Sequence, residues 1–452
     1  MTTLPAEFKG LRQIEELKID ANILHVIPDC VIQMRTLKRL HADNSGLDEL
    51  HQDIGNLINL EELTVSKNKI VTLANVHSLG QLTKLKMLSL KDNGLTALPS
   101  TLGILSETLE RLELEGNKLN YPPHLKDKDA ILKHLTDMLD GTRPCFRMKL
   151  MLVGQENVGK TSLLGALKKT KKNTVQAVTK VAVKPPLSTD GIDIENWSFQ
   201  INTPNLRPST NTVTLSVWDF AGQDIYYTTH QFFLSARAIY LVVWDLAQDE
   251  ELSKVEFWLQ SVKSRVSSAP IVLVGTHLDC LPKDVNVKTV IAKLQSKYKK
   301  RFPNIKTIAV VSTLTGKNIS QLKSDIERIV AQQSHMGEEL PQSYLLLEEL
   351  VEKERSKRSP PTIVWDEYAL LAKSCNIRSE ESLKRATRFL HETGSLIYFE
   401  EEESLNKMVI LDPQYLTKFM SSISTTKHNF AREGILYHIH LKQIWRPPEF
   451  PE

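Results

Sequence analysis

A chain of 452 residues, 41% hydrophobic and 25% charged, is too long for one hydrophobic core, so its length predicts about three domains. The formal net charge of +3 is small for this length, which argues against nucleic acid or an anionic membrane as a partner. The four cysteines have no CxxC spacing, which argues against a zinc site or a disulfide framework. The sequence shows no signal peptide and no apolar run of about 18 residues, which argues against export and against a transmembrane segment. Together these features favour a cytoplasmic location.

Residues 1–124 repeat a leucine pattern. Two copies, which begin at Leu60 and Leu85, satisfy LxxLxLxxNxL in full. Asparagines recur every 22 to 25 residues: Asn22, Asn44, Asn68, Asn93 and Asn117. This is the pattern of the leucine-rich repeat, in which a short strand points inward and the asparagine amide bonds backbone groups at the turn. It predicts an α/β leucine-rich-repeat solenoid whose concave surface binds protein partners, and a simple spacer is the alternative.

The first repeat begins midway, because residues 3–11 resemble the second half of a repeat and no polar cap precedes them. We therefore expect a fragment, with further repeats before it in a longer product. The pattern ends at residues 121–124. Apolar positions between residues 127 and 140 predict a helix that links the repeats to the next domain and stops at Gly141.

A complete GxxxxGK[ST] motif follows an apolar run that ends at Val153. The run predicts a strand, the glycines permit a turn that points backbone N–H groups inward, and a helix comes next, which is the geometry of a phosphate-binding P-loop. Lys160 is expected to reach the β- and γ-phosphates, and the Thr161 hydroxyl to bind Mg²⁺. The residues expected to contact nucleotide here are Gly154, Gln155, Glu156, Asn157, Val158, Gly159, Lys160, Thr161 and Ser162.

Two later loops supply the other parts of a phosphoryl-transfer site. An alternating strand delivers Asp219, expected to hold Mg²⁺, and Gly222, whose N–H is expected to approach the γ-phosphate. Gln223 is placed to orient the attacking water. Thr189, on an earlier loop, is the candidate hydroxyl that closes over Mg²⁺ and the γ-phosphate. Lys160, Thr189 and Gln223 are thus the predicted catalytic residues, and Thr161, Thr189 and Asp219 the predicted Mg²⁺ ligands.

The base is expected to lie at the ends of two later strands, at residues 270–275 and 307–311. The Asp279 carboxylate can accept from N1–H and the 2-amino group of guanine, a pair of donors that adenine lacks, so it favours GTP over ATP. The residues expected around the base are Thr276, His277, Asp279, Ser312, Thr313 and Leu314.

Residues 340–452 predict helices at 343–353, 367–374 and 380–392, and then a hairpin that pairs 396–399 with 408–411. Asp412 and Pro413 predict a helix cap and a helix start. This is an α+β, winged-helix-like unit of mixed charge, which favours coupling to protein over binding DNA. The end at residues 446–452 does not read as a finished domain.

The order of these motifs resembles the Roco family, in which leucine-rich repeats precede a Ras-like Roc GTPase domain and a COR domain. The likeness is greatest to its leucine-rich-repeat kinase branch, and it rests on the repeats and on residues 151–162, 188–193, 217–222 and 275–279. The resemblance implies leucine-rich repeats at 1–124, a linking helix at 125–144, Roc at 145–335 and the N-terminal part of COR at 340–452. It also implies binding of GTP or GDP with Mg²⁺, slow GTP hydrolysis, and a homodimer through Roc and COR. No kinase is expected within this chain.

Four positions depart from the usual Ras-like pattern. Glu156 stands where glycine is common, Thr276 and His277 replace Asn-Lys, and Thr313 replaces alanine. Glu156 supports an alternative in which the protein is a catalytically inert nucleotide-binding scaffold, whereas Gln223 favours hydrolysis. A further alternative is an ATPase switch that also carries leucine-rich repeats.

Overall fold

The computed structural model describes residues 8, 10, 11, 13–73, 76–119, 127–169, 192–200, 212–222, 231–248, 251–282, 285–333, 335–424 and 436–445. The chain forms two compact units. The first comprises Met1–Pro144, Glu338–Leu345 and Cys375–Ser382, and the second comprises Cys145–Gly337, Leu346–Ser374 and Leu383–Glu452. The first unit has one hydrophobic core beside its main sheet, and the second has two, one on each face of its main sheet.

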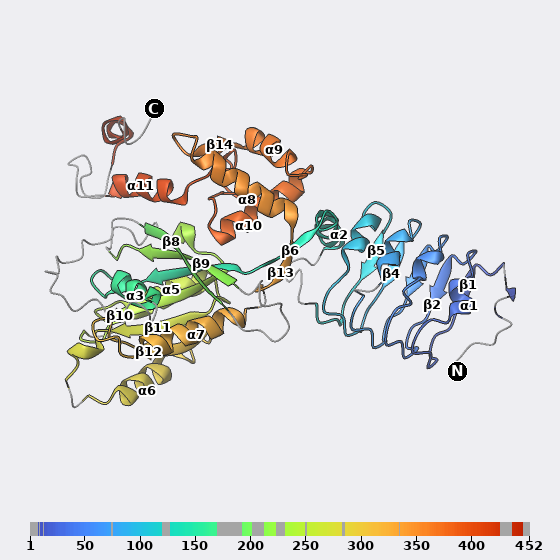
Figure 1. Ribbon diagram of the computed structural model, residues 1–452, viewed down its shortest axis with the longest axis horizontal. Coiled ribbons are helices and arrows are strands. Elements are labelled where there is room, and N and C mark those ends of the chain that lie inside the picture. The colour runs from blue at the N-terminus through green and yellow to red at the C-terminus, as the bar shows by residue number, and fades with distance from the viewer. Residues whose placement is uncertain are drawn as a thin grey trace. The chain divides into compact units, whose positions relative to one another are not determined.

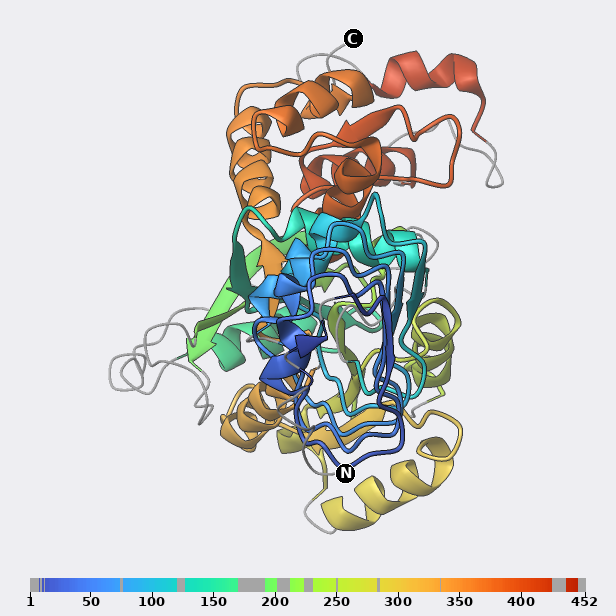
Figure 2. The same ribbon diagram turned by 90° about the vertical axis from the view of Figure 1, so that its right-hand side faces the viewer.

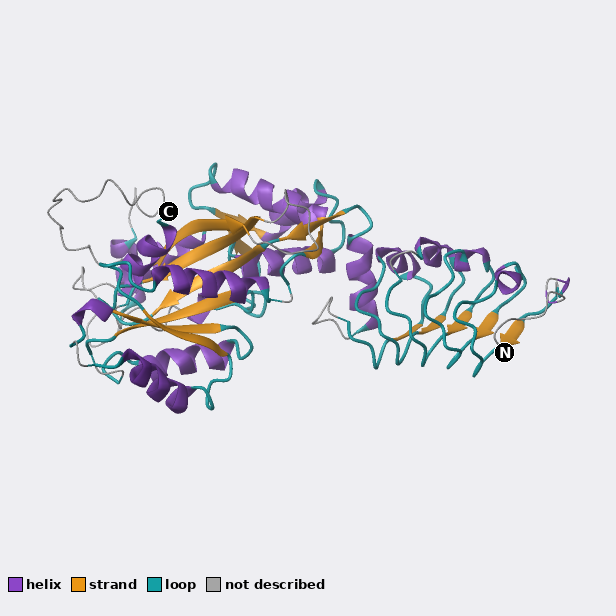
Figure 3. Cartoon of the chain, turned by 60° about the horizontal axis from the view of Figure 1, so that its bottom comes forward, coloured by secondary structure: helices purple, strands orange, loops and turns teal. Residues whose placement is uncertain are grey.

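The first unit is a stack of coils that each contribute one short strand to a five-stranded parallel sheet. The strands are β1 (Glu16–Lys18), β2 (Arg39–His41), β3 (Glu62–Thr64), β4 (Met87–Ser89) and β5 (Arg111–Glu113). The short helices are α1 (Asp29–Ile32), η2 (Ile54–Asn56), η3 (His77–Gln81) and η4 (Ser100–Leu105). Figure 2 shows coils of similar outline behind one another, and Figure 3 shows strands along one side of the stack and helices along the other.

The register of the strands explains the leucine spacing. Leu17, Leu40, Leu63, Leu88 and Leu112 are paired from strand to strand in that order. The first four are buried, and the last packs against the same core. Alternation along a strand turns the residues on either side of each leucine away from the core, where their identity is free to vary.

The asparagines after the strands bond neighbouring coils together. Asn68 accepts hydrogen bonds at Oδ1 from the N–H groups of Ser45 (2.9 Å) and Leu47 (3.0 Å). Its Nδ2 donates to the carbonyl oxygens of Ala42 and Val65, both at 2.9 Å. A buried amide with these four bonds satisfies backbone groups that have no partner in a regular strand or helix.

The prediction for Asn44 was wrong by one residue. Ser45 occupies the inward position of that coil, where it is fully buried and its Oγ donates to the carbonyl oxygen of Ile19 at 2.7 Å. Asn44 has a φ of 52°, and it matches Lys67 (57°) and Asp92 (51°), each of which precedes an inward asparagine. Asparagine adopts the left-handed conformation more readily than most residues, so its side chain is used here for the turn.

Helix α2 (Lys128–Asp137) forms where a linking helix was predicted. Asp127 caps it, because its Oδ2 accepts from the N–H of Ala130 at 3.0 Å. Ile131 and Leu135 on its apolar face belong to the core of the coils. After it, β6 (Thr142–Cys145) pairs with β13 (Glu338–Pro341).

The second unit contains a six-stranded sheet in the order β12-β11-β10-β7-β9-β8 (Figure 1). The pairings are parallel except for β8, which is antiparallel to β9. The strands are β7 (Arg147–Val153), β8 (Ile192–Gln200), β9 (Thr212–Phe220), β10 (Ala238–Asp245), β11 (Ile271–Thr276) and β12 (Ile305–Val310). The helices between them are α3 (Lys160–Lys168), η8 (Gln231–Phe233), α5 (Val255–Arg265), η9 (Leu278–Cys280), α6 (Val287–Tyr298) and α7 (Ile319–Ala331).

The central strand β7 is buried on both faces of the sheet. Leu150 and Leu152 join one core with residues of α3 and α7, whereas Met151 and Val153 join the other core with residues of α5 and α6. A strand between two layers of helices needs apolar residues at every position, which is why this segment reads as a continuous apolar run. The second core extends further along the chain to Ile397 and Ile410.

The remainder of this unit is helical with a small antiparallel sheet. Its elements are α8 (Gln342–Arg355), β14 (Thr362–Val364), α9 (Trp365–Lys373), α10 (Glu380–Thr393), β15 (Met408–Ile410), α11 (Pro413–Ser424), η10 (His438–His440) and α12 (Leu441–Ile444). The predicted helices form, and α11 begins at the predicted cap, where Asp412 Oδ1 accepts from the N–H of Gln414 at 3.0 Å. In the described ranges, no helix has both the length and the apolarity that crossing a membrane requires.

The predicted hairpin needs a correction. Residues 396–399 meet 408–411 through a single bridge, Ile397 to Ile410, and the main partner of β15 is β14, with Ile363 opposite Val409. The strand β14 follows Pro360 and Pro361 directly. Proline is compatible with the start of a strand as well as with the end of a helix, so the short run after it pairs at the edge of this sheet.

Candidate functional site

The glycines of the phosphate loop are required by its backbone. Gly154 has a φ of 151°, and a Cβ there would lie 2.2 Å from the carbonyl oxygen of Val243. Gly159 has a φ of 85°, and α3 begins at the next residue. Asn157, at a φ of 63°, is a third left-handed position in the loop. The loop therefore delivers the unpaired N–H groups of a helix N-terminus at the end of β7.

Lys160 lies inside this loop. Its side chain is buried, and Nζ donates to the carbonyl oxygens of Gly154 (2.8 Å) and Gln155 (2.7 Å). Burial lowers the pKa of this ammonium to about 8, and Asp219 and Glu156 oppose that change. A cation held by carbonyl groups of an anion-binding loop is placed to meet phosphate oxygens.

Thr161 and Asp219 come together from α3 and from the end of β9. The Thr161 hydroxyl donates to Asp219 Oδ2 at 2.5 Å, and Asp219 is 1% exposed. Asp219 Oδ1 is buried and has no hydrogen-bond partner in the described part of the chain, and burial raises the pKa of this carboxyl group. An unpartnered carboxylate oxygen beside a hydroxyl fits a hard divalent cation.

The donor set suits Mg²⁺ more than a cation that needs a full protein cage. Nowhere in the described ranges do three or more His, Cys, Asp or Glu side chains gather in a way that could hold a metal. Mg²⁺ keeps several waters and binds phosphate oxygens together with one or two protein ligands, so Thr161 and Asp219 would be sufficient.

Gly222 places the segment after Asp219 against the phosphate loop. A Cβ at Gly222 would lie 2.2 Å from the backbone nitrogen of Glu156, so only glycine permits this approach. Gln223 and Thr189, the other predicted catalytic residues, lie outside the described residues.

Thr276 connects the loop that is predicted to contact the base to the phosphate loop. It is fully buried, and its hydroxyl lies 2.6 Å from the carbonyl oxygen of Val158 and 3.0 Å from that of Trp244. The next residue, His277, has a φ of 56°, and its Nδ1 lies 2.9 Å from Oδ1 of the buried Asp245. Asp245 was not predicted from the sequence, although its position at the end of an apolar strand was a usable signal.

Asp279 and Ser312 form the other half of the base side. Asp279 is exposed, and its pKa is lowered, chiefly by a hydrogen bond from Ser312. The two loops are also joined through their backbones, because the N–H of Leu278 donates to the carbonyl oxygen of Val311 at 3.1 Å. Thr313 is half-buried, and the side chain of Leu314 is 84% exposed. An ionised carboxylate that is open to solvent is available to hydrogen-bond donors of a base.

A phosphate loop on the central strand of this sheet, with Asp219 on the next strand, defines a Ras-like P-loop domain of the GTPase type. Residues 149–279 match the family model described as "Ras of Complex, Roc, domain of DAPkinase". Residues 341–452 match the model described as "C-terminal of Roc, COR-A domain". The chain belongs to the Roco family.

Similar curated proteins agree with this assignment. The chain is 49% identical over 377 residues to the probable serine/threonine-protein kinase pats1 of Dictyostelium discoideum, with 79% of the chain and 11% of that protein covered. It is 27% identical to leucine-rich repeat serine/threonine-protein kinase 1 of Caenorhabditis elegans, with 83% of the chain and 17% of that protein covered.

A solved structure is also similar. The Roco2 RocCORdC structure from Methanosarcina barkeri, bound to GDP, has a TM-score of 0.53 and 26% identity, and the match covers 68% of this chain and 85% of that one. The curated relatives are far longer proteins, since the chain spans 11% to 25% of their lengths.

Proposed function

We propose that this protein is a guanine-nucleotide switch that binds GTP and GDP with Mg²⁺ and hydrolyses GTP slowly. The observation that carries the proposal is the hydrogen bond from Thr276 to Val158. It joins the base-side loops, with the open carboxylate of Asp279, to the loop that holds Lys160. A site of this kind can bind a nucleotide at its base and at its phosphates together.

The reaction that these residues support is in-line attack of water on the γ-phosphate. Lys160 and the N–H groups at the start of α3 stabilise charge on the phosphate oxygens, and the burial of Lys160 strengthens that interaction. Thr161 and Asp219 would hold Mg²⁺, which supplies charge neutralisation when bound. Gln223 and Thr189 are retained as the proposed residues that orient water and close over the γ-phosphate.

Guanine is the proposed base for two reasons. Asp279 presents ionised oxygens that suit the paired donors of guanine, and the similar Roco2 structure was obtained with GDP. Titration calorimetry of the whole chain with GDP, GTP and ATP, in Mg²⁺ and in chelator, tests this choice. We expect GDP and GTP to bind, Mg²⁺ to strengthen binding, and ATP not to compete; preferential binding of ATP would instead support an ATPase switch.

Hydrolysis requires its own test, because an inert scaffold would bind nucleotide equally well. The backbone nitrogen of Glu156 lies against Gly222, so Glu156 belongs to the part of the phosphate loop that meets the segment after Asp219. Single-turnover release of phosphate from bound GTP separates the alternatives. Release above the buffer rate supports a GTPase, and retention of intact GTP supports the scaffold.

The remaining parts of the chain are proposed to pass the nucleotide state to partners. The strand register and the Asn68 bonds support a leucine-rich-repeat solenoid at residues 1–124, linked through 125–144 to Roc at 145–335 and the N-terminal part of COR at 340–452. We propose that the repeats bind proteins and that Roc and COR mediate a homodimer. We also propose a role in signal transduction, in which an attached kinase responds to the nucleotide state. Light scattering with GDP and with a non-hydrolysable GTP analogue tests the dimer.

A further inference from the structure

Lys149, near the start of the phosphate-loop strand β7, is fully buried and contacts the last turn of α10. Its Nζ donates to the carbonyl oxygen of His391 at 3.0 Å and lies 4.8 Å from the centroid of the Trp218 ring. Lys149 and Lys160 are the buried lysines of the described residues, and they stand at the two ends of the same strand and loop.

Gly394, which ends α10, allows the helix to approach both partners. It has a φ of 86°, and a Cβ there would lie 2.9 Å from Lys149 Cε and 2.9 Å from Trp218 Cζ2. Glycine is therefore required by the backbone conformation and by the contact. Trp218 directly precedes Asp219, so this contact lies one residue from a proposed Mg²⁺ ligand.

The segment that leads into β10 forms hydrogen bonds with the same turn of α10. The Ser235 hydroxyl donates to the carbonyl oxygen of Glu392 at 3.2 Å, and Arg237 Nε donates to Glu392 Oε2 at 3.0 Å. The Arg237 guanidinium also lies 5.4 Å from the centroid of the Phe389 ring. Residues of β7, of β9 and of the segment before β10 thus all contact residues 389–394.

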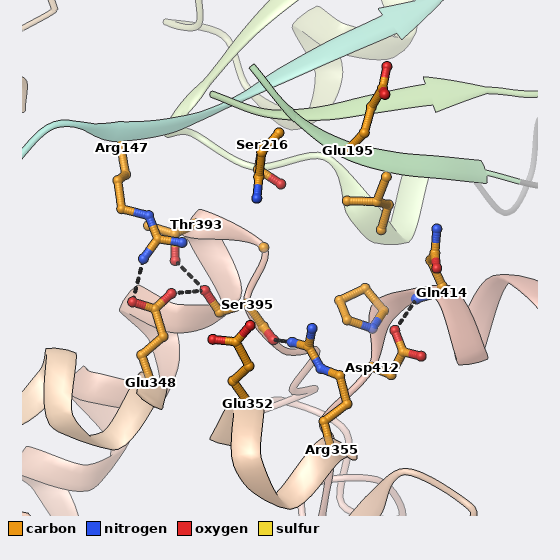
Figure 4. Close-up of a pocket in the computed structure, with 14 residues that line it drawn as sticks. Arg147, Glu195, Ser216, Glu348, Glu352, Arg355, Thr393, Ser395, Asp412 and Gln414 are labelled. Atoms are coloured by element: carbon orange, nitrogen blue, oxygen red, sulfur yellow. Dashed lines mark hydrogen bonds and ion pairs between the residues drawn. The ribbon is translucent and has the colours of Figure 1, made fainter. Parts of the chain in front are cut away.

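A polar cavity of about 220 Å³ lies beside this junction (Figure 4). Arg147 of β7 pairs with Glu348 of α8, and Ser395 donates to the same carboxylate from the other side. Arg355 donates to the carbonyl oxygen of Ser395 at 2.5 Å. Because Arg147, Glu348 and Arg355 are hydrogen-bonded within the chain, we interpret their polar contacts as support for the junction and not as a ligand site.

Electrostatics explains why Lys149 binds the last turn of α10. The last carbonyl groups of a helix have no partner within the helix and carry partial negative charge. The N–H groups of a buried lysine, whether charged or neutral, need an acceptor of that kind. Lys149 therefore caps α10 from another element, and separating the two exposes both groups to water.

We propose that Lys149 is a positioning residue through which the last turn of α10 controls how fast the nucleotide site releases its ligand. This inference rests on the proposed function, because it concerns the same site. While α10 is docked, it holds the strands that carry the phosphate loop and Asp219, and undocking frees them and speeds release.

The charges around Lys149 give the junction a pH dependence. Burial lowers the pKa of Lys149 to about 7, opposed by Glu392, which is itself paired with Arg237. Burial also lowers the pKa of His391 to about 3, so its imidazole is neutral while α10 is docked. Undocking exposes Lys149, whose pKa then rises toward the usual value of about 10.4, and a proton is taken up. Undocking and nucleotide release are therefore expected to be faster at pH 6 than at pH 8.

The test measures release of a fluorescent GDP from the whole chain, together with hydrogen exchange of residues 389–394. Gly394→Ala is expected to speed release at least about fivefold and to raise exchange, because the methyl group separates α10 from Lys149. Gly46→Ala is the control, since Gly46 has a φ of 65° and a Cβ there meets only ordinary contacts. Release at the unaltered rate from Gly394→Ala would overturn the proposal.

Lys149→Met separates positioning from packing, because methionine preserves volume and cannot ionise. It is expected to reduce the difference in release between pH 6 and pH 8, and the part that remains comes from His391, which also takes up a proton when it is exposed. Lys306→Met, at an exposed lysine of β12, is expected to keep the full difference. A pH difference as large in Lys149→Met as in the unaltered chain overturns the proposal. If the unaltered chain binds no GDP, the proposed function fails, and the exchange of residues 389–394 in Gly394→Ala still decides whether the junction exists.

Discussion

The hydroxyl of Thr276 donates to the carbonyl oxygen of Val158 at 2.6 Å, so the end of β11 is hydrogen-bonded to the phosphate loop. Asn-Lys is usual at the positions of Thr276 and His277 in Ras-like proteins. Threonine keeps a side-chain donor to the loop, and Asp245 holds the imidazole that replaces lysine.

Thr276→Val is expected to weaken GDP binding about tenfold, because a buried carbonyl oxygen loses its hydrogen bond at a cost of about 1.4 kcal/mol. Thr276→Ser is the matched control, since it retains the hydroxyl. Titration calorimetry measures both variants. Equal affinities for the valine and serine variants would show that this bond does not support nucleotide binding.

Asp279→Ala is expected to weaken GDP binding by a factor of about 10 to 100 and to leave ADP binding unchanged, because hydrogen bonds to a charged group contribute about 1.5–3 kcal/mol. Asp325→Ala serves as the control, since that carboxylate pairs with Arg328 at 2.9 Å on α7. Competition against a fluorescent GDP gives both affinities. A parallel loss for GDP and ADP would assign Asp279 a structural role.

Asp219→Asn is expected to raise the folding stability of the protein and to remove the effect of Mg²⁺ on GDP affinity. Burial raises the pKa of Asp219 above its unfolded value, so ionising it costs the folded state stability, and that cost grows as pH rises through the raised pKa. Without nucleotide, the asparagine variant should be more stable at pH 8 by about 1 kcal/mol, and the gain should shrink at pH 4.

Urea unfolding at the two pH values measures this difference. The same variant should lose the increase in GDP affinity that Mg²⁺ gives, because it lacks the ionised oxygen. A variant that is less stable at pH 8, or that keeps the full effect of Mg²⁺, contradicts the assignment of Asp219.

Asn68→Ala is expected to loosen the coils locally by about 2 kcal/mol, because the buried N–H groups of Ser45 and Leu47 lose their acceptor. Hydrogen exchange at those two amides measures the effect. Asn59→Ala, which removes an exposed bond from Nδ2 to the carbonyl oxygen of Arg35, is the control. Unchanged protection of Ser45 in Asn68→Ala would show that the asparagine does not hold the coils.

The sequence by itself determined the parts of the protein whose signals are local. Leucine spacing predicted a strand in each coil, because one residue per strand must face the core. Glycines at 154 and 159 predicted the phosphate loop, because their left-handed backbone is costly for other residues. Motif positions predicted Thr161 and Asp219 as Mg²⁺ ligands, and their oxygens lie 2.5 Å apart, while the binding of Mg²⁺ itself stays a prediction.

The tertiary structure alone decided which distant groups share an environment. Ser45 replaced Asn44, β14 replaced the predicted partner of β15, and Asp245 proved to hold His277. The contact of Lys149 with His391 joins residues 242 positions apart, and nothing near either residue in the sequence marks it. Periodicity and turn chemistry act over a few residues, whereas burial and the pairing of a buried charge depend on which surfaces the folded chain brings together.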